Sequence, residues 1–437
     1  MIFIGPRNLL VSRQKSRFLA SLGITASRVR CEELKGDPIS LAVRRPVRYS
    51  PPRRQILAGD RQNVKYCEPM TAIQQNVPLK PYTTFKIGGP ARFFATASTP
   101  EEFRSALDFA RRERLPVFVL GGGSNILVSD RGFDGLVIHP AQKGMEHEAC
   151  GEDAVLVRIQ AGEIWDEAVR KVVEREWWGI ENLSHIPGQV GAALVQNIGA
   201  YGQQIGDVLD SAEVMEIETG AVRTLSPKDC RLAYRASIFN TTAPSRFIIL
   251  SLHLRLNSLG KPNLAYRDVR DYFAERGDAE PTIADVRRAI IEIRDRKFPF
   301  PREERGGNAG SFFKNLPVRK DEFETLRVAL ARNFPTSVMQ RLEEIRQRST
   351  SEHIKLPAAF LIDICGLKGY RVGGAEVNPQ QPLVLLNRGG ATASDVLALA
   401  RHIRRTVHAR TGMILELEPQ LVGIEEKGAL DFHSEKS

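Results

Sequence analysis

The chain has 437 residues, of which 42% are hydrophobic and 26% are charged. This composition is typical of a globular protein, and the length predicts two or three domains rather than a single core. No apolar run reaches the roughly 20 residues that a membrane-spanning helix needs, which argues against a membrane protein. The five cysteines are scattered and show no C-x-x-C spacing. We therefore expect reduced thiols in a cytoplasmic protein, without a disulfide framework or a zinc site.

The excess positive charge is concentrated at the beginning of the chain. The formal net charge is +10, and residues 1–69 hold 14 Lys and Arg against five Asp and Glu. This segment is also rich in Ser and Pro and lacks hydrophobic periodicity, which predicts a disordered basic extension. An organellar transit peptide is an alternative interpretation, and Met70 could equally be the first residue of the functional protein. Because the remaining residues are nearly neutral, the folded part predicts no nucleic-acid partner.

The first ordered pattern combines short strands with a capped helix. Residues 79–91 predict a strand-and-turn run that closes on Gly-Gly-Pro, and residues 92–95 predict a short strand. Thr99, followed by Pro100 and two acidic residues, is typical of a helix start. The next predicted strand, at residues 116–120, runs directly into glycines.

A glycine-rich loop follows this strand, at Gly121, Gly122, Gly123, Ser124 and Asn125. Bare backbone N–H groups can converge on phosphate oxygens where no side chain blocks them, so the loop is a candidate phosphate-binding site. It matches neither the G-x-G-x-x-G dinucleotide motif nor a Walker motif, since no suitable lysine follows. For the loop alone, a tight turn between two strands is an equally good interpretation.

A second tract rich in Gly and Ala lies at residues 179–202. It follows predicted strands at residues 136–138 and 155–160 and a predicted helix from Trp165 to about Glu176. Such a tract is poor core material, and it suits a backbone surface that lies against a large flat ligand such as a flavin. Close packing of glycine-containing helices is the alternative.

Arg235 stands out because it lies among apolar and aromatic residues. An unpaired guanidinium would be costly there, so we expect Arg235 to meet a carboxylate of the protein or of a ligand. A structural ion pair is the alternative. Further strands are expected at residues 213–218, 222–225 and 247–256. Thr282 begins an amphipathic helix that extends to Arg296, and the cationic end of this helix suits a diphosphate or is a solvated charged face.

The stretch Gly307–Asn315 places one hydroxyl, that of Ser311, among glycines and aromatic residues. Small residues let the backbone pass close to a bulky ligand, to which Ser311 could donate a proton; a glycine-rich turn is the alternative. Helices are expected at residues 321–332, 337–347 and 393–410. A last strand at residues 413–422 would put Glu416 and Glu418 on one face. The eight histidines show no metal-ligand spacing, so we expect no metal.

Together these tracts resemble the UDP-N-acetylenolpyruvoylglucosamine reductase family, known as MurB. The resemblance extends from about Val77 to Gly423, and its most specific parts are G-S-F-F-K-N, I-P-G-Q-V-G and N-I-G-A-Y-G. It implies an FAD enzyme that uses NADPH to reduce the enolpyruvyl group of a UDP-sugar, which gives UDP-N-acetylmuramate for peptidoglycan synthesis. We expect a cytoplasmic monomer.

The fold that this resemblance implies is α+β and α/β. An FAD-binding module of the PCMH type would comprise two subdomains, at residues 70–138 and 139–280. A MurB C-terminal α/β domain, at residues 281–423, would bind the substrate. Residues 424–437 would form a flexible tail.

The resemblance also assigns roles to individual residues. Ser311 matches the general acid that protonates C2, and Arg235 and Glu418 match the residues that polarise the substrate carboxylate. Alignment back from Gly423 selects Glu418 over Glu416. Contacts with FAD are implied for Gly121, Gly122, Gly123, Ser124, Asn125, Ile186, Pro187, Gly188 and Gly191. Contacts with the substrate are implied for Tyr266, on a mobile loop of the type I subfamily, and for Lys297, Asn315 and Gln381.

The sequence departs from the family pattern at four positions that carry no catalytic group: His185, Ala236, Leu316 and Gln420. Two other functions remain open. Another flavin oxidase or dehydrogenase of the same fold would not need Ser311, Arg235 and Glu418 together. A sugar-nucleotide sensor would retain the binding pocket without turnover.

Overall fold

The computed structural model describes residues 71–278, 280–297, 306–348 and 352–425. All of them belong to one compact unit, Tyr66–Ser437. The predicted basic extension and residues 426–437 of the predicted tail lie outside the described residues. Within the described ranges, no helix is long and apolar enough to cross a membrane, and no cluster of His, Cys, Asp or Glu could hold a metal ion. The cysteines of these ranges, Cys150, Cys230 and Cys365, are free.

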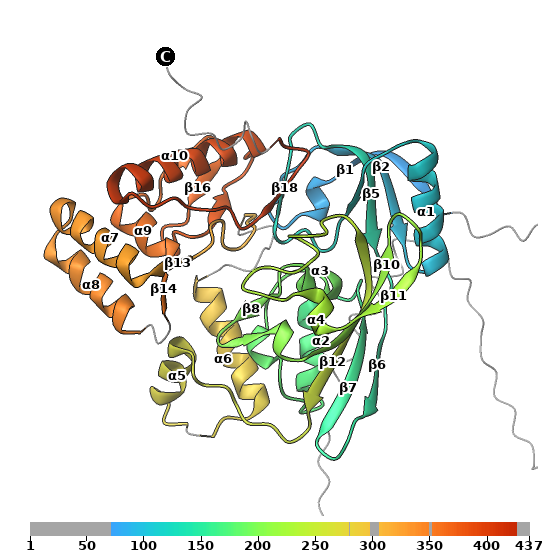
Figure 1. Cartoon of the computed structure of the whole chain (residues 1–437), viewed down its shortest axis with the longest axis horizontal. Coiled ribbons are helices and arrows are strands. Elements are labelled where there is room, and N and C mark those ends of the chain that lie inside the picture. The colour runs from blue at the N-terminus through green and yellow to red at the C-terminus, as the bar shows by residue number, and fades with distance from the viewer. Residues whose placement is uncertain (1–70, 279, 298–305, 349–351, 426–437) are drawn as a thin grey trace, which may run out of the picture. The chain divides into compact units, whose positions relative to one another are not determined.

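The first part of the fold is a four-stranded sheet with one long helix beside it (Figure 1). Its strands follow the order β1-β2-β5-β3, with bounds Ile73–Pro78 (β1), Pro90–Ala97 (β2), Val117–Val119 (β3) and Phe133–Pro140 (β5). β2 and β3 both pair with β5 in parallel, so that Phe94 lies beside Val137. Helix α1 (Pro100–Arg112) buries Phe103 against this sheet, and Thr99 caps it by accepting a hydrogen bond from the Glu102 N–H at 3.2 Å. The predicted strand–helix–strand passage into the glycine loop is therefore confirmed.

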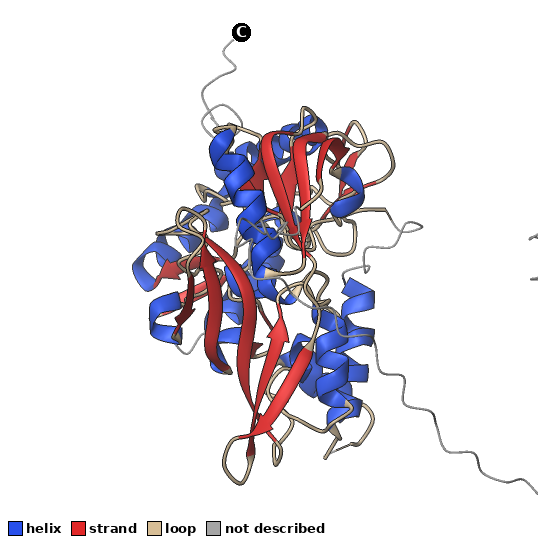
Figure 2. Cartoon of the chain, turned by 90° about the vertical axis from the view of Figure 1, so that its right-hand side faces the viewer, coloured by secondary structure: helices blue, strands red, loops and turns tan. Residues whose placement is uncertain are grey.

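The second part is a five-stranded antiparallel sheet, whose long strands are seen in Figure 2. In the order β11-β10-β12-β7-β6, the strands are Val222–Leu225, Leu209–Glu216, Phe247–Asn257, Ala154–Gln160 and Met145–Ala149. Helices α2 (Trp165–Val173) and α3 (Val190–Val195) share its core. The shorter elements of this part are β8 (Gly199–Ala200), β9 (Gln203–Gln204) and α4 (Pro227–Cys230). Trp165 is fully buried, and its indole N–H donates to the Leu183 carbonyl at 2.9 Å, which fixes the start of α2.

Two further helices, α5 (Arg267–Ala274) and α6 (Ile283–Lys297), pack on each other and on Tyr201. α6 is the helix predicted to begin at Thr282. The Thr282 hydroxyl donates to Asp285 Oδ2 at 2.6 Å and accepts from the Asp285 N–H at 3.2 Å. α6 also contacts α2 and the 3-10 helix Glu181–Leu183, so its packing belongs to the second part of the fold.

The C-terminal part is built of helices and short strand pairs. Its helices are α7 (Lys320–Asn333), α8 (Thr336–Gln347), α9 (Ala358–Ile364) and α10 (Ala393–Thr411), and its strands are β13 (Leu316–Arg319), β14 (His353–Leu356), β15 (Arg371–Val372), β16 (Ala375–Val377) and β17 (Leu385–Asn387). Thr392 caps α10 through the Asp395 N–H at 3.0 Å. The hydrophobic core of this part includes Phe85, Ile87 and Leu127 from the beginning of the fold. Residues of the first part therefore complete the core of the last.

The strand predicted at residues 413–422 is much shorter in the structure. The chain first pairs with the Ser311 stretch, where the Glu418 N–H donates to the Phe312 carbonyl at 3.0 Å. Pro419 has no N–H to continue this pairing. The chain then changes partner, and β18 (Gln420–Val422) pairs in parallel with β4 (Ile126–Val128). The prediction of one continuous strand is wrong because it merges these two pairings.

Candidate active site

The two glycine-rich tracts singled out in the sequence lie against each other. A methyl group on Gly122 would stand 2.5 Å from Cα of Gly188, and one on Gly188 would stand 2.8 Å from Oγ of Ser124. A methyl group on Gly121 would stand 2.8 Å from Cβ of Ala192. Packed interiors do not tolerate such short distances. Contact between the loops therefore requires glycine here, independently of any ligand.

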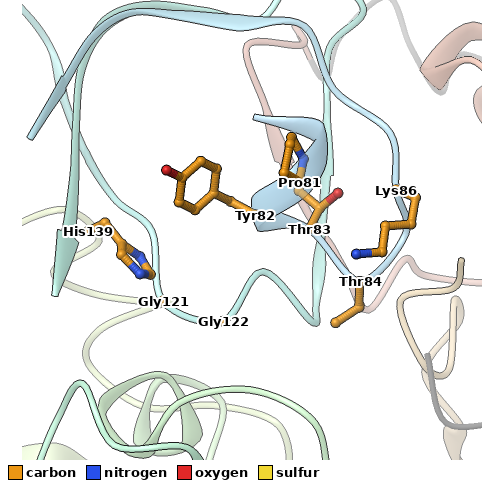
Figure 3. Close-up of a pocket in the computed structure, with 8 residues that line it drawn as sticks. All are labelled: Pro81, Tyr82, Thr83, Thr84, Lys86, Gly121, Gly122 and His139. Atoms are coloured by element: carbon orange, nitrogen blue, oxygen red, sulfur yellow. The ribbon is translucent and has the colours of Figure 1, made fainter. Parts of the chain in front are cut away.

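A cavity of about 220 Å³ opens beside the first glycine loop (Figure 3). It is lined by Pro81, Tyr82, Thr83, Thr84, Lys86, Gly121, Gly122 and His139. The rings of Tyr82 and His139 contact each other at 5.5 Å, and His139 Nδ1 lies 2.7 Å from the Leu120 carbonyl oxygen. Burial lowers the pKa of His139, so this ring is a neutral part of the wall. Lys86 contributes a cation to this lining, and no motif in the sequence indicates a role for Lys86 or His139.

A second cavity, of about 110 Å³, is lined mainly by apolar residues and also reaches Gly121. Its walls come from β3, α3 and β12 and include Phe118, Phe247 and Gly191. The Gly121 backbone thus borders both cavities. A diphosphate needs backbone N–H groups and a cation, and flat rings need apolar walls. The residues present therefore fit the FAD that the sequence predicts.

Asn125, at the end of the first glycine loop, connects this loop with the C-terminal part. Its Nδ2 donates to Gln196 Oε1 at 2.7 Å and to the Glu418 carbonyl oxygen at 3.1 Å. Its own carbonyl accepts a hydrogen bond from the Gln420 N–H at 3.0 Å. Hydrogen bonds therefore hold the candidate cofactor loop beside the candidate catalytic glutamate.

Arg235 and Glu418, the two predicted partners of the substrate carboxylate, form a buried ion pair. Arg235 Nε lies 2.7 Å from Glu418 Oε1, and the side chains are 22% and 8% exposed. The Nε–H makes no aligned hydrogen bond within the described part of the chain, so the contact is mainly electrostatic. Arg235 Nη1 donates to the Gly199 carbonyl at 3.1 Å. The expectation that Arg235 meets a carboxylate is confirmed.

The surroundings of Glu418 differ sharply from those of Glu416. Burial raises the pKa of Glu418 above its ordinary value of 4.5, although Arg235 and, more weakly, Lys314 act in the opposite direction. The Glu416 side chain is 75% exposed and lies 3.5 Å from Lys314 Nζ. A carboxyl group whose pKa is raised can stay protonated next to an anion. This contrast supports the choice of Glu418 over Glu416.

The backbone before and after Ser311 is constrained, by the conformation of Gly310 on one side and by pairing with other segments on the other. Gly310 has a φ of +70°, a left-handed conformation that favours glycine. Ser311 forms a β-bridge with Val384, and the next residue, Phe312, accepts the hydrogen bond from Glu418. The half-buried Ser311 is therefore directly adjacent in the chain to a residue bonded to Glu418.

Asn315, one of the predicted substrate-binding residues, contacts a neighbour of the ion pair. Its Nδ2 donates to the Tyr234 hydroxyl at 3.5 Å, and the guanidinium of Arg235 lies 5.6 Å from the centre of the Tyr234 ring. Tyr266 directly precedes α5 and contacts Tyr201 edge to face at 5.2 Å. The structure thus joins Asn315 to the Arg235 environment through Tyr234.

The other two predicted substrate-binding residues have partners of their own. Lys297 Nζ lies 2.6 Å from Asp268 Oδ2 in an ion pair. The Gln381 carbonyl accepts a hydrogen bond from the Val384 N–H at 3.0 Å. Because Val384 also bridges to Ser311, Gln381 is connected to the Ser311 stretch, whereas Lys297 is engaged at the end of α6.

Lys355, on β14, is a candidate site residue that the sequence did not indicate. Its Nζ lies 4.7 Å from the centre of the Tyr234 ring. Burial lowers the pKa of Lys355, Arg235 lowers it further, and Glu418 raises it. In the sequence this lysine alternates with buried Ile354 and Leu356, a pattern that predicts a solvent-facing side chain, and Lys355 is indeed exposed, beside the Tyr234 ring.

The cationic end of α6, predicted to suit a diphosphate, partly supports the second glycine tract instead. Arg294 Nε donates to the His185 carbonyl at 2.9 Å. Earlier in the helix, Arg287 makes two bonds with Asp166, at 2.6 and 3.0 Å, and Asp166 accepts from the His185 N–H at 2.6 Å. These contacts fix the position of His185, the residue that precedes I-P-G.

Two domain families match the chain. One is described as an FAD binding domain and matches residues 91–226. The other is the C-terminal domain of UDP-N-acetylenolpyruvoylglucosamine reductase and matches residues 301–422. Together with the site geometry, these matches define a flavin-dependent oxidoreductase that has a dedicated C-terminal domain.

Similar proteins match about four fifths of this chain over almost their own full length. The chain is 44% identical to UDP-N-acetylenolpyruvoylglucosamine reductase of Pseudomonas aeruginosa, over 80% of this chain and 98% of that protein. It is 41% identical to the enzyme of the same name from Neisseria gonorrhoeae, over 80% and 97%. The crystal structure of this reductase (MurB) from Thermus caldophilus matches with a TM-score of 0.53 at 26% identity, over 80% and 99%. The chain belongs to the UDP-N-acetylenolpyruvoylglucosamine reductase family, which confirms the predicted fold class and FAD as cofactor.

Proposed function

We propose that Ser311, Arg235 and Glu418 carry the chemistry of the reductase reaction. As a member of this family, the protein reduces the enolpyruvyl group of UDP-N-acetylglucosamine enolpyruvate to give UDP-N-acetylmuramate, a peptidoglycan precursor. FAD, when bound, supplies the redox chemistry by taking hydride from NADPH and delivering it to the substrate double bond. The observation that carries the residue assignment is the Arg235–Glu418 pair, bonded to the glycine loop through Asn125 and to the Ser311 stretch through Phe312.

The ion pair suits the charge that develops on the substrate. When hydride adds to a double bond conjugated with a carboxylate, negative charge moves onto that carboxylate. The guanidinium of Arg235 is a preorganised partner for such charge. Glu418, whose pKa is raised by burial, can act as a neutral hydrogen-bond donor instead of repelling the anion. The pair therefore provides one cation and one acid for the two substrate oxygens.

Ser311 completes the addition by giving a proton to C2, the carbon that bears the carboxylate, after hydride has reached C3. A serine hydroxyl is a weak acid, so the step requires close approach to a strongly basic carbon. The left-handed Gly310 before Ser311 and the β-bridge to Val384 restrict where the hydroxyl can lie. This restriction supports Ser311 as a positioned proton donor.

The remaining predicted contacts complete the proposal. FAD contacts Gly121, Gly122, Gly123, Ser124, Asn125, Ile186, Pro187, Gly188 and Gly191. The UDP-sugar contacts Tyr266, Lys297, Asn315 and Gln381. The enzyme acts as a monomer in the cytoplasm, and the free thiols of the described cysteines agree with a reducing compartment.

For the domain organisation, we place the division between the two FAD-binding subdomains after β5, which ends at Pro140, rather than after residue 138. We place the start of the substrate domain after α6 rather than at residue 281. The packing of α6 on α2 and on the 3-10 helix Glu181–Leu183 supports this later division.

Ser311→Ala tests the assignment by separating the two half-reactions. We expect flavin reduction by NADPH to keep its wild-type rate, while formation of UDP-N-acetylmuramate falls by about 10²–10⁴-fold because only this step needs the proton. Stopped-flow absorbance follows the first half-reaction, and chromatography of the product follows the second. Ser337→Ala, at an exposed position of α8, is the matched control. Survival of both half-reactions in Ser311→Ala would show that Ser311 is not the proton donor.

A further inference from the structure

Gln189 follows I-P-G in the second glycine tract, and neither the sequence nor the proposed function gives it a role. Its Nε2 donates to the Pro140 carbonyl at 3.1 Å and to the Gly162 carbonyl at 3.4 Å. Both amide hydrogens are therefore directed at carbonyl oxygens. Rotating the amide by half a turn would place Oε1 against the same two carbonyls, so the hydrogen bonds determine where Oε1 points.

Gln189 Oε1 is buried and has no hydrogen-bond partner within the ranges that the structure describes. Gln189 also lines the apolar cavity of about 110 Å³, as does Gly121. Gly121 lies next to this acceptor, since a methyl group on it would stand in van der Waals contact with Oε1, at 3.5 Å. A buried acceptor without a donor is costly, which means that the site suits a ligand able to donate a hydrogen bond.

The walls of the cavity restrict the chemistry of that donor. Phe118, Phe239 and Phe247 line it, and aromatic side chains pack well against flat rings. Oε1 accepts hydrogen bonds and cannot donate them. A phosphate or carboxylate, which only accepts, does not match this part of the site. A planar ring that carries an N–H group does.

We propose that Gln189 is a specificity-determining residue for the flavin cofactor, and that its Oε1 accepts a hydrogen bond from an N–H group on a ring of FAD. The inference rests on the proposed function in so far as FAD is the cofactor. FAD has two such groups, the amino group of adenine and N3–H of the isoalloxazine. The backbone N–H groups of the glycine loops are donors and cannot recognise either of them, whereas Gln189 Oε1 can.

The test measures binding of FAD and two analogues to the full-length protein from which flavin has been removed, by quenching of flavin fluorescence. One analogue lacks the adenine amino group, and the other is methylated at flavin N3. We expect the wild type to bind one analogue about tenfold more weakly than FAD, the change expected from loss of one buried hydrogen bond. The analogue that binds weakly identifies the donor. Gln189→Leu should bind FAD and that analogue with equal affinity.

Gln142→Leu is the matched control. Gln142 is also buried, its Nε2 donates to the Leu250 carbonyl at 3.4 Å and its Oε1 also has no partner in the described ranges, but it does not line the cavity. This variant should keep the wild-type preference for FAD. Gln189→Met, which is similar in length, replaces Gln189→Leu if the latter does not fold.

Two results would overturn the inference while leaving the proposed function intact. One is equal binding of all three flavins by the wild type. The other is a preference for FAD that persists unchanged in Gln189→Leu and Gln189→Met. Failure of the wild type to bind any flavin would overturn the proposed function and this inference with it.

Discussion

Replacing Arg235 with methionine should make the stability of the protein depend on pH through Glu418. The Glu418 side chain is 8% exposed, and its Oε1 lies 2.7 Å from Arg235 Nε. Loss of the guanidinium leaves a carboxylate in a buried site without its cation. A carboxylate in that position takes up a proton rather than remain charged. The free energy of this proton uptake sets the size of the effect.

The magnitude follows from the ordinary pKa of the glutamate, 4.5. Above that pH the carboxyl group is ionised in the unfolded chain, while in folded Arg235→Met it remains protonated. The folded state then binds more protons, so stability falls as pH rises, by about 1.36 kcal/mol per pH unit. Relative to a chain with no ionisable group at position 418, the loss reaches about 3.4 kcal/mol at pH 7.0 and about 1.4 kcal/mol at pH 5.5.

The assay compares Arg235→Met with Arg235→Met/Glu418→Gln, because glutamine resembles a protonated glutamate. Urea unfolding at the two pH values, with FAD at saturation, gives the free energy of unfolding of each. The difference between the two variants should shrink by about 2 kcal/mol at the lower pH. A difference that stays constant, or that grows at the lower pH, would refute the idea that Glu418 becomes protonated. Arg92→Met, which removes the partner of the 85% exposed Asp134, should show no such pH dependence.

Two further substitutions test the contacts that hold the two glycine loops in position. Gly122→Ala should weaken FAD binding by more than about tenfold and cost about 1–3 kcal/mol of stability, because the added methyl group would stand 2.5 Å from Cα of Gly188. Flavin titration and thermal unfolding measure both effects. Arg287→Met should lower the free energy of unfolding by about 3–5 kcal/mol, because Arg287 and Asp166 are only 12% and 18% exposed and the variant leaves Asp166 unpaired beneath His185. Urea unfolding measures this loss.

Each of these predictions has a result that contradicts it. Unchanged flavin affinity in Gly122→Ala would mean that the two loops can separate without affecting the cofactor site. For the Arg287–Asp166 ion pair, Arg288→Met is the matched control. Arg288 is 65% exposed, and its pair with Asp285 should contribute less than about 1 kcal/mol to stability. Equal losses in the two arginine variants would show that burial of the Arg287 pair does not matter.

The sequence predicted the local structure well where the signal itself is local. Thr99 and Thr282 begin helices as expected, because a hydroxyl that bonds to a backbone N–H three residues later needs no other part of the chain. The carboxylate partner of Arg235 was also predicted, because an unpaired guanidinium among apolar residues is costly wherever the partner lies.

Contacts between distant segments could not be predicted in this way. Phe85 and Leu127 belong to the C-terminal core, and β18 pairs with β4, which lies almost 300 residues earlier in the chain. No local sequence pattern at these positions indicates either contact. The prediction for residues 413–422 failed for the same reason. Alternation indicates that a segment is extended, whereas the choice of partner on either side of Pro419 depends on the assembled fold.

The glycines of the two loops and of the Ser311 stretch are required for several different physical reasons. In the Ser311 stretch, a methyl group on Gly307 would stand 2.1 Å from the Phe85 carbonyl oxygen, whereas one on Gly310 would meet no atom within 4 Å. Gly310 is instead required by its φ of +70°. Gly122 is required by the opposite loop, and Gly121 borders both cavities. The small residues therefore do not mark ligand contacts one by one. They allow segments far apart in the sequence to approach until the groups that face the ligand converge.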